Sequence, residues 1–355
     1  MQFARQSSLG LEIFHESTLA VGLKGVAQIN AGGMEFIRAY GTFPSPNVLA
    51  GFLGICLFFV FYLFLKKGSG QYYLLAHSRP ASAGLRGSGY FAPPSAETMP
   101  KQSSNPREGN TVHSLKVAFL EKYLLSLSLF VLSFGLMLTF SRGVIVFFIF
   151  TSVLFFVGVF LLEKLKKYKT QAIKLAVLVV VSWLFVIAVA WPEVSSRFLE
   201  STISEPAIQE RLFFNKVGTD TISQNYSQLF FGVGIGNFVN HYMQFVPGLA
   251  PYLYQPVHNI YILIASEVGI LGLVAFIVFL AALLWKSIKR LLPSITIQDA
   301  HDREHLVYVF SLLLVACFVL FIGMYDHYFW TLQQGGLMFW ITLGLLAATV
   351  STKTK

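Results

Sequence analysis

The stretch Asn259–Trp285 reads NIYILIASEVGILGLVAFIVFLAALLW and is followed at once by Lys286, Lys289 and Arg290. A helix crosses a bilayer with about 20 consecutive apolar residues, so this run can span it with tilt or extend beyond it. Six further runs are long enough to cross, at Asn47–Leu65, Tyr123–Phe140, Gly143–Leu162, Leu175–Trp191, Leu306–Tyr325 and Trp330–Val350. The sequence therefore predicts an all-α, polytopic membrane protein with about seven transmembrane helices.

The composition agrees with a membrane protein and excludes other classes. Apolar residues make up 55% of the chain and charged residues 12%, whereas soluble domains carry about 25% charged residues. The net charge of +9 does not indicate nucleic-acid binding, because most Lys and Arg flank apolar runs, where they orient the chain in the membrane. Cys56 and Cys317 each lie inside an apolar run, which favours buried apolar side chains over a disulfide or a metal site.

Charged residues between the apolar runs predict the orientation. If the runs alternate in direction, one side receives the basic positions Lys66, Lys67, Lys116, Lys122, Lys164, Lys166, Lys167, Lys169, Lys286, Lys289, Arg290, Lys353 and Lys355. The positive-inside rule makes this side cytoplasmic. The extracytoplasmic side then receives residues 1–46, the Ser141–Gly143 turn, a large loop over 192–258 and the Asp326–His327 turn.

The organisation follows from these runs and from two segments of distinct composition. Residues 68–112 are rich in Gly, Ser, Pro and Ala, which predicts a flexible cytoplasmic loop between the first span (47–65) and three helices over 123–191. The extracytoplasmic loop over 192–258 would carry the catalytic groups, and three more helices follow over 259–350. Residues 1–46 are mostly polar, and no apolar helix precedes them for export. We therefore expect this chain to be the C-terminal part of a longer protein.

Reactive groups are densest between Glu210 and Leu273. Arg211 heads a polar segment, the turn Gly232–Phe238 is rich in glycine, and His258 directly precedes the longest apolar run. Glycines can expose backbone amides to an anion, and a guanidinium binds phosphate with two parallel donors. The dipole of the following helix would favour neutral His258, the form that a general base needs. This set predicts chemistry on an anionic, lipid-borne substrate at the bilayer surface.

Each of these motifs also has a plainer interpretation. Arg211 can lie in an amphipathic helix on the membrane, Gly232–Phe238 can be a simple turn, and His258 can be an interfacial hydrogen-bonding residue. The glycines do not follow a strand of a βαβ unit, which argues against a dinucleotide loop. Glu267, within the apolar run, needs a partner, and we expect a structural hydrogen bond to a neighbouring helix rather than catalysis.

Three further segments place polar groups on the predicted outer side. Arg38 lies ahead of Pro44, Pro46 and Asn47, where Asn47 can cap the first helix and Arg38 can extend to the interface. Arg142 is confined to a tight turn between two runs and would contact either lipid phosphate or a substrate. Asp326 can be a counter-ion for an arginine or an orienter for His258, although the surrounding aromatic residues also suit an interfacial belt.

Five of these motifs together resemble the O-antigen ligase and O-antigen polymerase family, in its shared C-terminal domain. They are RAYGTFPSPN at Arg38–Asn47, SRG at Ser141–Gly143, an Arg ahead of GVGIGNF at Gly232–Phe238, HNIYI with EVGILGL within His258–Leu273, and DHYFWTLQQG at Asp326–Gly335. The resemblance covers nearly the whole chain except residues 68–112. Family members commonly have ten or more membrane helices, which adds to the expectation of a truncated member.

The resemblance implies a glycosyltransferase of the cytoplasmic (inner) membrane, acting on its outer face without a metal or another cofactor. Its donor would be a glycan on undecaprenyl pyrophosphate. Its acceptor would be a hydroxyl on lipid A core, a growing glycan, a protein or a wall polymer. The resemblance implies an enzyme of the O-antigen ligase type, with a polymerase of the same family as the alternative. The catalytic residues implied are His258, Arg211 and Arg142; the substrate-binding residues implied are Arg38, Gly234, Gly236, Asn259, Asp326 and Gln334.

Two other classes compete with the enzyme. A transporter of polyprenyl-linked glycans would place ionisable groups along a path through the bilayer, with broken helices. Here Glu267 is the clear mid-helix carboxylate and the other candidates gather on one side, which favours an enzyme. Polar motifs concentrated on one side also disfavour a purely structural membrane subunit.

Overall fold

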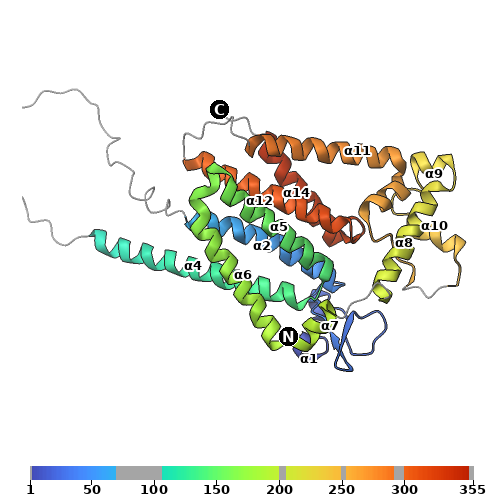
Figure 1. Ribbon diagram of the computed structural model, residues 1–355, viewed down its shortest axis with the longest axis horizontal. Coiled ribbons are helices and arrows are strands. Elements are labelled where there is room, and N and C mark those ends of the chain that lie inside the picture. The colour runs from blue at the N-terminus through green and yellow to red at the C-terminus, as the bar shows by residue number, and fades with distance from the viewer. Residues whose placement is uncertain (1, 69–105, 200–204, 249–252, 292–299, 352–355) are drawn as a thin grey trace, which may run out of the picture.

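The computed structural model describes residues 2–68, 106–199, 205–248, 253–291 and 300–351 (Figure 1). The loop predicted at 68–112 lies outside the described residues over 69–105. Its end does not fit that prediction, because residues 106–112 already belong to helix α4 (Pro106–Leu138). Proline suits the first turn of a helix, where its missing N–H has no partner to lose.

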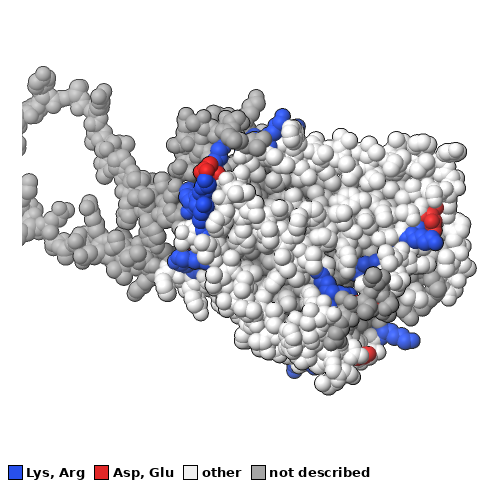
Figure 2. All heavy atoms as spheres, in the orientation of Figure 1, with Lys and Arg blue, Asp and Glu red and all other residues white. Residues whose placement is uncertain are grey.

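Seven helices in the described part of the chain are long and apolar enough to cross a membrane, which confirms the predicted number. They are α2 (Pro46–Gly68), α4, α5 (Arg142–Leu161), η2 with α6 (Glu163–Tyr168 and Lys169–Val189), α11 (Ile260–Leu291), α12 (Ala300–Gly323) and α14 (Gln333–Ser351). The chain is therefore a multi-pass membrane protein. Figure 2 shows Lys and Arg gathered toward the two ends of the bundle, with an almost uncharged flank between them.

Helix α12 forms the centre of the bundle. It packs against α2, α5, α11 and α14. Of its most apolar stretch 78% is buried, whereas only 17% of the corresponding stretch of α11 is buried. Close packing relies on small residues: a Cβ on Gly54 of α2 would lie 2.3 Å from the ring of Phe318 of α12. Large apolar side chains such as Val274 and Val278 of α11 stay exposed, as a surface facing lipid requires.

Residues 2–45 form a small folded cap at the same end of the bundle as α7–α10 (Figure 1). It contains α1 (Gln2–Arg5), η1 (Glu12–Phe14) and an antiparallel hairpin of β1 (Gln28–Ala31) and β2 (Met34–Ile37). Gly32 and Gly33 make the turn with φ of 61° and 81°, a backbone that glycine adopts without strain. The Gln2 side chain accepts from the Tyr40 amide at 3.0 Å and so joins both ends of the cap.

The segment over 192–258 is more ordered than one large loop. It holds α7 (Trp191–Phe198), α8 (Pro206–Ser223), α9 (Tyr226–Phe231) and α10 (Phe238–Phe245), and a further short helix, α13 (Tyr328–Thr331), joins α12 to α14. These helices lie at one end of the bundle together with the cap (Figure 1). The polar motifs from distant parts of the sequence are therefore brought to that end.

Helix α11 breaks at Gly269, where φ is 77° and ψ is 177°. A break inside a membrane helix frees backbone carbonyls, which must find other donors. The amide of Val233 donates to Ser266 O and that of Gly234 to Glu267 O, both at 2.9 Å. Gly232, with φ of 71°, lets the loop approach this closely. The glycine-rich turn thus completes the hydrogen bonding of the broken helix.

Candidate active site

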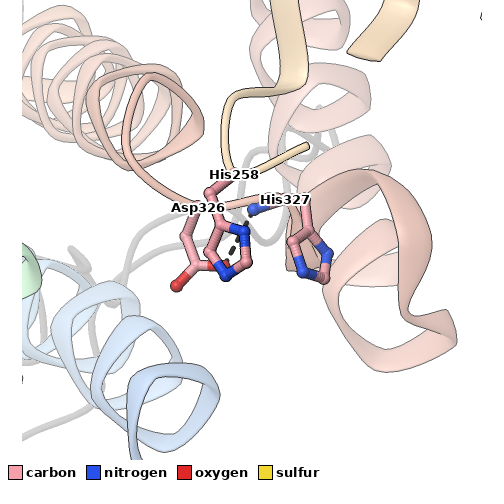
Figure 3. Close-up of side chains that lie close together, drawn as sticks. All are labelled: His258, Asp326 and His327. Carbon is pink, nitrogen blue, oxygen red and sulfur yellow. Dashed lines mark hydrogen bonds between the residues drawn. The ribbon is translucent and has the colours of Figure 1, made fainter. Parts of the chain in front are cut away.

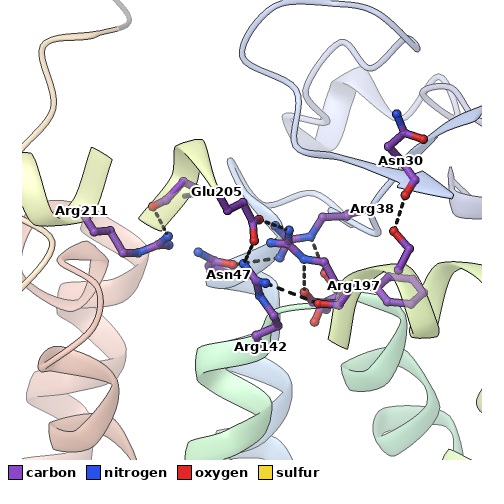
Figure 4. Close-up of polar contacts among 11 residues, drawn as sticks. Asn30, Arg38, Asn47, Arg142, Arg197, Glu205 and Arg211 are labelled. Atoms are coloured by element: carbon purple, nitrogen blue, oxygen red, sulfur yellow. Dashed lines mark hydrogen bonds and ion pairs between the residues drawn. The ribbon is translucent and has the colours of Figure 1, made fainter. Parts of the chain in front are cut away.

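Four arginines from four parts of the fold gather at one end of the bundle (Figure 4). Arg38 follows β2, Arg142 begins α5, Arg197 lies near the end of α7, and Arg211 lies in α8. Burial lowers the pKa of Arg38 most, and electrostatic repulsion from each of the three others lowers it further. Like charges gather only if negative charge compensates their repulsion, so this cluster is a candidate anion-binding site.

Glu205, just ahead of α8, bridges two of these arginines. Its Oε2 lies 2.7 Å from Arg142 Nη2, and its Oε1 lies 2.7 Å from Arg197 Nη1. Burial raises the pKa of the Glu205 carboxyl, but the bonds to Arg142 and Arg197 outweigh burial and lower it. The side chain is 21% exposed. Glu205 is therefore ionised and reachable from solvent.

Arg38 is the most deeply placed of the four. Its side chain donates from Nε to Thr139 O at 2.7 Å and from Nη2 to Asn47 Oδ1 at 3.0 Å. Burial, followed by repulsion from Arg197, lowers its pKa to about 9. Arg38 thus remains charged at neutral pH and is fixed by the turn between α4 and α5 and by α2. The sequence-based alternative of an arginine extending to the interface does not describe this buried position.

Asn47 connects the arginine cluster to a second group of residues. Its Oδ1 accepts from Arg38 and from Ser141 Oγ, and its Nδ2 donates to Asp326 Oδ2 at 2.9 Å. The predicted capping role is wrong, because α2 begins at Pro46 and the hydroxyl of Ser45 accepts from the Val48 amide. Asn47 instead links Arg38 of the arginine cluster to Asp326 of the second group by hydrogen bonds.

His258, Asp326 and His327 form the second group (Figure 3). One ligand-type atom from each lies within 4.8 Å of the others. The His258 ring stacks on Phe214 of α8 and meets the His327 ring edge-on, with centroids 4.9 Å apart. Asp326 Oδ1 accepts from the His327 amide at 2.9 Å, and Oδ2 lies 3.8 Å from Arg211 Nη2. Asp326 is therefore the counter-ion predicted for an arginine, and it also faces His258.

Burial sets the protonation of this group. It lowers the pKa of His258 below its ordinary value of 6.5 despite the nearby Asp326 carboxylate, and it lowers the pKa of His327 in the same way. For Asp326, burial raises the pKa, but His327, His258 and Arg211 outweigh burial and lower it. At neutral pH His258 is thus a neutral imidazole beside the Asp326 carboxylate. The main cause of the lowered pKa of His258 is burial, rather than the helix dipole that was expected from the sequence.

Comparison with known proteins yields one family. Residues 127–277 match the family model described as O-Antigen ligase. Residues 127–277 are therefore similar to the O-antigen ligase domain. The match confirms the resemblance to this family over 127–277, which contains three of the five motifs, while the motifs at Arg38–Asn47 and Asp326–Gly335 lie outside it. No curated protein and no solved structure matches the chain.

The candidate site extends beyond the matched O-antigen ligase domain. Arg142, Arg197, Glu205, Arg211 and His258 lie within 127–277. The matched part therefore contains the candidate base and three of the four arginines. Outside it lie Arg38, Asn47, Asp326 and His327, which the fold brings to the same place.

Several residues predicted to bind substrate have other contacts. The Gly234 amide is taken up by Glu267 O, so it offers no free donor in this conformation. Asn259 Oδ1 accepts from the Tyr261 and Ile262 amides and caps α11, while its Nδ2 donates to Met324 O. Gln334 is exposed in the first turn of α14. No contact among the described residues links Asn259 or Gln334 to the arginine cluster.

Gly236 and Glu267 complete the comparison with the sequence. Gly236 has φ of 71°, and a Cβ there would meet no atom within 4 Å, so its surroundings are open. No hydrogen bond of its amide is described, and its predicted role stays a prediction. Glu267 accepts from Trp330 Nε1 of α13 at 3.2 Å, which confirms the structural hydrogen bond to another helix.

The spacing of His258, Asp326 and His327 would by itself suit a metal ion. The charges around it do not, because Asp326 already accepts from Asn47 and lies beside Arg211, and Arg38 and two further arginines stand next to them. A divalent cation would be repelled by these guanidinium groups, whereas an anion would be attracted. The surroundings therefore favour an anion.

Sequence reasoning missed Arg197, Glu205 and His327. Arg197 follows the fourth span on the side that the sequence predicts to be extracytoplasmic, where the positive-inside rule disfavours cations, and the same signal singled out Arg142. Glu205 and His327 carry no local signal, since their importance depends on partners from other helices.

Proposed function

We propose that the protein transfers a glycan from an undecaprenyl-pyrophosphate carrier to an acceptor hydroxyl, as an inverting, metal-independent glycosyltransferase. The observation that carries the proposal is the pairing of a four-arginine cluster with a buried neutral imidazole, joined through Asn47 and Asp326. The arginine cluster suits a pyrophosphate ligand, and the neutral imidazole of His258 can act as a general base. The O-antigen ligase domain supports this reaction class.

The arginines would bind the leaving pyrophosphate. Negative charge grows on it as the bond between the anomeric carbon and the phosphate oxygen breaks. Preorganised donors in a partly dehydrated site stabilise such charge strongly. Arg211 supports this role, because its buried Nε makes no hydrogen bond to any described residue, and its guanidinium lies over the Tyr325 ring at 4.5 Å. A buried donor of this kind is ready for a substrate oxygen.

His258 would take the proton of the acceptor hydroxyl while that oxygen attacks the anomeric carbon from the face opposite the pyrophosphate. The new glycosidic bond forms as the bond to the phosphate oxygen breaks, so the anomeric centre inverts. The proton ends on His258, where Asp326 stabilises the imidazolium. General-base help of this kind contributes typically about 10² to 10⁴ in rate.

We further propose that the site faces the outside of the cytoplasmic membrane. Lys164, Lys166 and Lys167 lie in η2 and Lys169 begins α6, so all four follow the C-terminal end of α5, whereas Arg142 of the cluster begins that helix. The positive-inside rule then makes the lysine end cytoplasmic. A lipid-linked donor would reach the cluster along the outer surface of the membrane.

The deciding experiment uses the full chain in proteoliposomes with a labelled undecaprenyl-pyrophosphate glycan and candidate acceptors. Transfer of label that depends on the acceptor and releases the lipid pyrophosphate supports the proposal, and the acceptor used separates ligase from polymerase. His258→Ala should abolish most transfer, whereas His241→Ala in α10, whose ring contacts Gln224 and Gln228, serves as the matched control. Label that crosses the bilayer on an intact donor would refute the enzyme and indicate a transporter.

A further inference from the structure

The carboxylate of Glu205 lies where a substrate anion would be expected. Both of its oxygens are bound, one by Arg142 and one by Arg197, each at 2.7 Å. A carboxylate and a phosphate present oxygens to guanidinium groups in similar geometry. The site between Arg142 and Arg197 is thus built for an oxyanion, and an internal residue occupies it.

The described residues do not balance the charges of the cluster. Four arginines gather here, and the described ion pairs supply two carboxylates, Glu205 and Asp326. Burial keeps His258 and His327 from adding positive charge, yet two guanidinium charges stay without a carboxylate. A ligand with more negative charge than Glu205 would fit the cluster better.

Arg142 and Arg197 keep other contacts that do not involve Glu205. Arg142 Nη1 donates to Arg197 O at 3.4 Å, and Arg197 Nε donates to Phe140 O at 3.5 Å. Ser196 Oγ also donates to Asn30 O, which ties α7 to the N-terminal cap (Figure 4). The two guanidinium groups are therefore positioned by backbone carbonyls, and they would remain in place if the carboxylate left.

We propose that Glu205 is an internal placeholder for a phosphate of the donor, and that Arg197 is an additional phosphate-binding residue. The incoming phosphate takes the positions of the Glu205 oxygens between Arg142 and Arg197. The carboxylate, which is 21% exposed, turns to solvent. This inference rests on the proposed function for the identity of the donor. It adds Arg197 as a phosphate-binding residue and a competition between the Glu205 carboxylate and the donor phosphate, neither of which the family match supplies.

The test measures binding of inorganic pyrophosphate to the detergent-solubilised full chain by calorimetry, at pH 7.5 and low salt. Glu205→Gln removes the competing charge and should tighten binding about 10-fold, whereas Arg197→Gln should weaken it about 10-fold, each the size of one charge-assisted hydrogen bond. Glu163→Gln and Arg290→Gln are matched controls at the other end of the bundle, where Glu163 pairs with Lys166 and Arg290 donates to Val350 O.

Tighter pyrophosphate binding in Glu205→Gln together with weaker binding in Arg197→Gln supports the placeholder role of Glu205. Weaker binding in both would mean that Glu205 orients the arginines, and unchanged binding in Glu205→Gln would mean that no competition exists; either result overturns the inference. If Arg197→Gln fails to fold, Arg197→Lys keeps the charge without the planar fork and should still bind more weakly than wild type. Because the assay uses no glycan and no acceptor, its outcome is independent of whether the protein catalyses transfer.

Discussion

Replacing Gly269 by Ala should destabilise the protein by about 3 kcal/mol. The φ of 77° and ψ of 177° at this position form a backbone conformation that is essentially confined to glycine, and it costs a residue with a Cβ about 1 to 3 kcal/mol. The added Cβ would lie 2.2 Å from Phe230 O and 2.4 Å from Phe231 N. These are backbone atoms that cannot rotate away, so α9 must move from α11. That movement weakens the bonds from Val233 and Gly234, each worth about 1 kcal/mol.

The assay is the apparent melting midpoint of the detergent-solubilised protein, read as loss of the monodisperse peak in size-exclusion chromatography. A change of about 3 kcal/mol corresponds to roughly 4 °C, because an unfolding entropy of about 2.1 cal/mol/K per residue is summed over 355 residues. Gly344→Ala is the matched control, because Gly344 lies inside α14 and a Cβ there meets nothing within 4 Å. Alanine is favoured over glycine within a helix, so this control should melt at or slightly above the wild-type temperature.

A midpoint for Gly269→Ala within about 2 °C of the Gly344→Ala control would refute the reasoning. It would mean that the break in α11 relaxes into a continuous helix at no cost, and that the turn at Gly232–Gly236 contributes little to its stability. Gly232→Ala gives an independent check, because its Cβ would meet the backbone of Glu267 at 2.3 Å from the other side.

The remaining predictions concern the reaction. His258→Ala should lower transfer by about 10² to 10⁴ with unchanged expression, and near-normal transfer would remove His258 from the role of base. Arg211→Lys should lose at least about 10-fold, because lysine lacks the planar fork; full activity would mean that a point charge suffices. Burial lowers the pKa of His258, so the base stays deprotonated below pH 6.5 and transfer at pH 6 should match that at pH 7.5; a loss centred on pH 6.5 would contradict this. EDTA should leave the transfer rate unchanged, and restoration of lost activity by a divalent metal would show that His258, Asp326 and His327 bind one.

The membrane helices were predictable from the sequence because a bilayer imposes a local rule, about 20 apolar residues in succession. The hairpin in residues 28–37 and the break in α11 were not, because both depend on partners elsewhere in the chain. Gly269 illustrates the difference: glycine is common in membrane helices, and only the approach of Val233 and Gly234 reveals a broken one.

The candidate site shows the same division. Arg142 and His258 were singled out because a cation in a tight turn between two spans, or an imidazole before a helix, is unusual in itself, and Arg211 was singled out because it heads a polar segment ahead of a glycine-rich turn. Glu205 was missed, since an acidic residue in a polar segment has no local distinction. The structural use of Asn259 and Gly234 was also missed, because it depends on hydrogen bonds to backbone atoms of other segments.

The hydrogen bond between Asn47 and Asp326 has a consequence for biosynthesis. It joins residues 279 positions apart, and Arg38 and Ser141 depend on the same amide. At about 5 to 20 residues per second, roughly 15 to 55 seconds separate the synthesis of the two partners. During that interval the first helices are already made, while the Asn47 side chain, to which Arg38 donates, lacks its Asp326 partner. The nascent chain therefore cannot hold the base and the anion site together until its last pair of helices is synthesised.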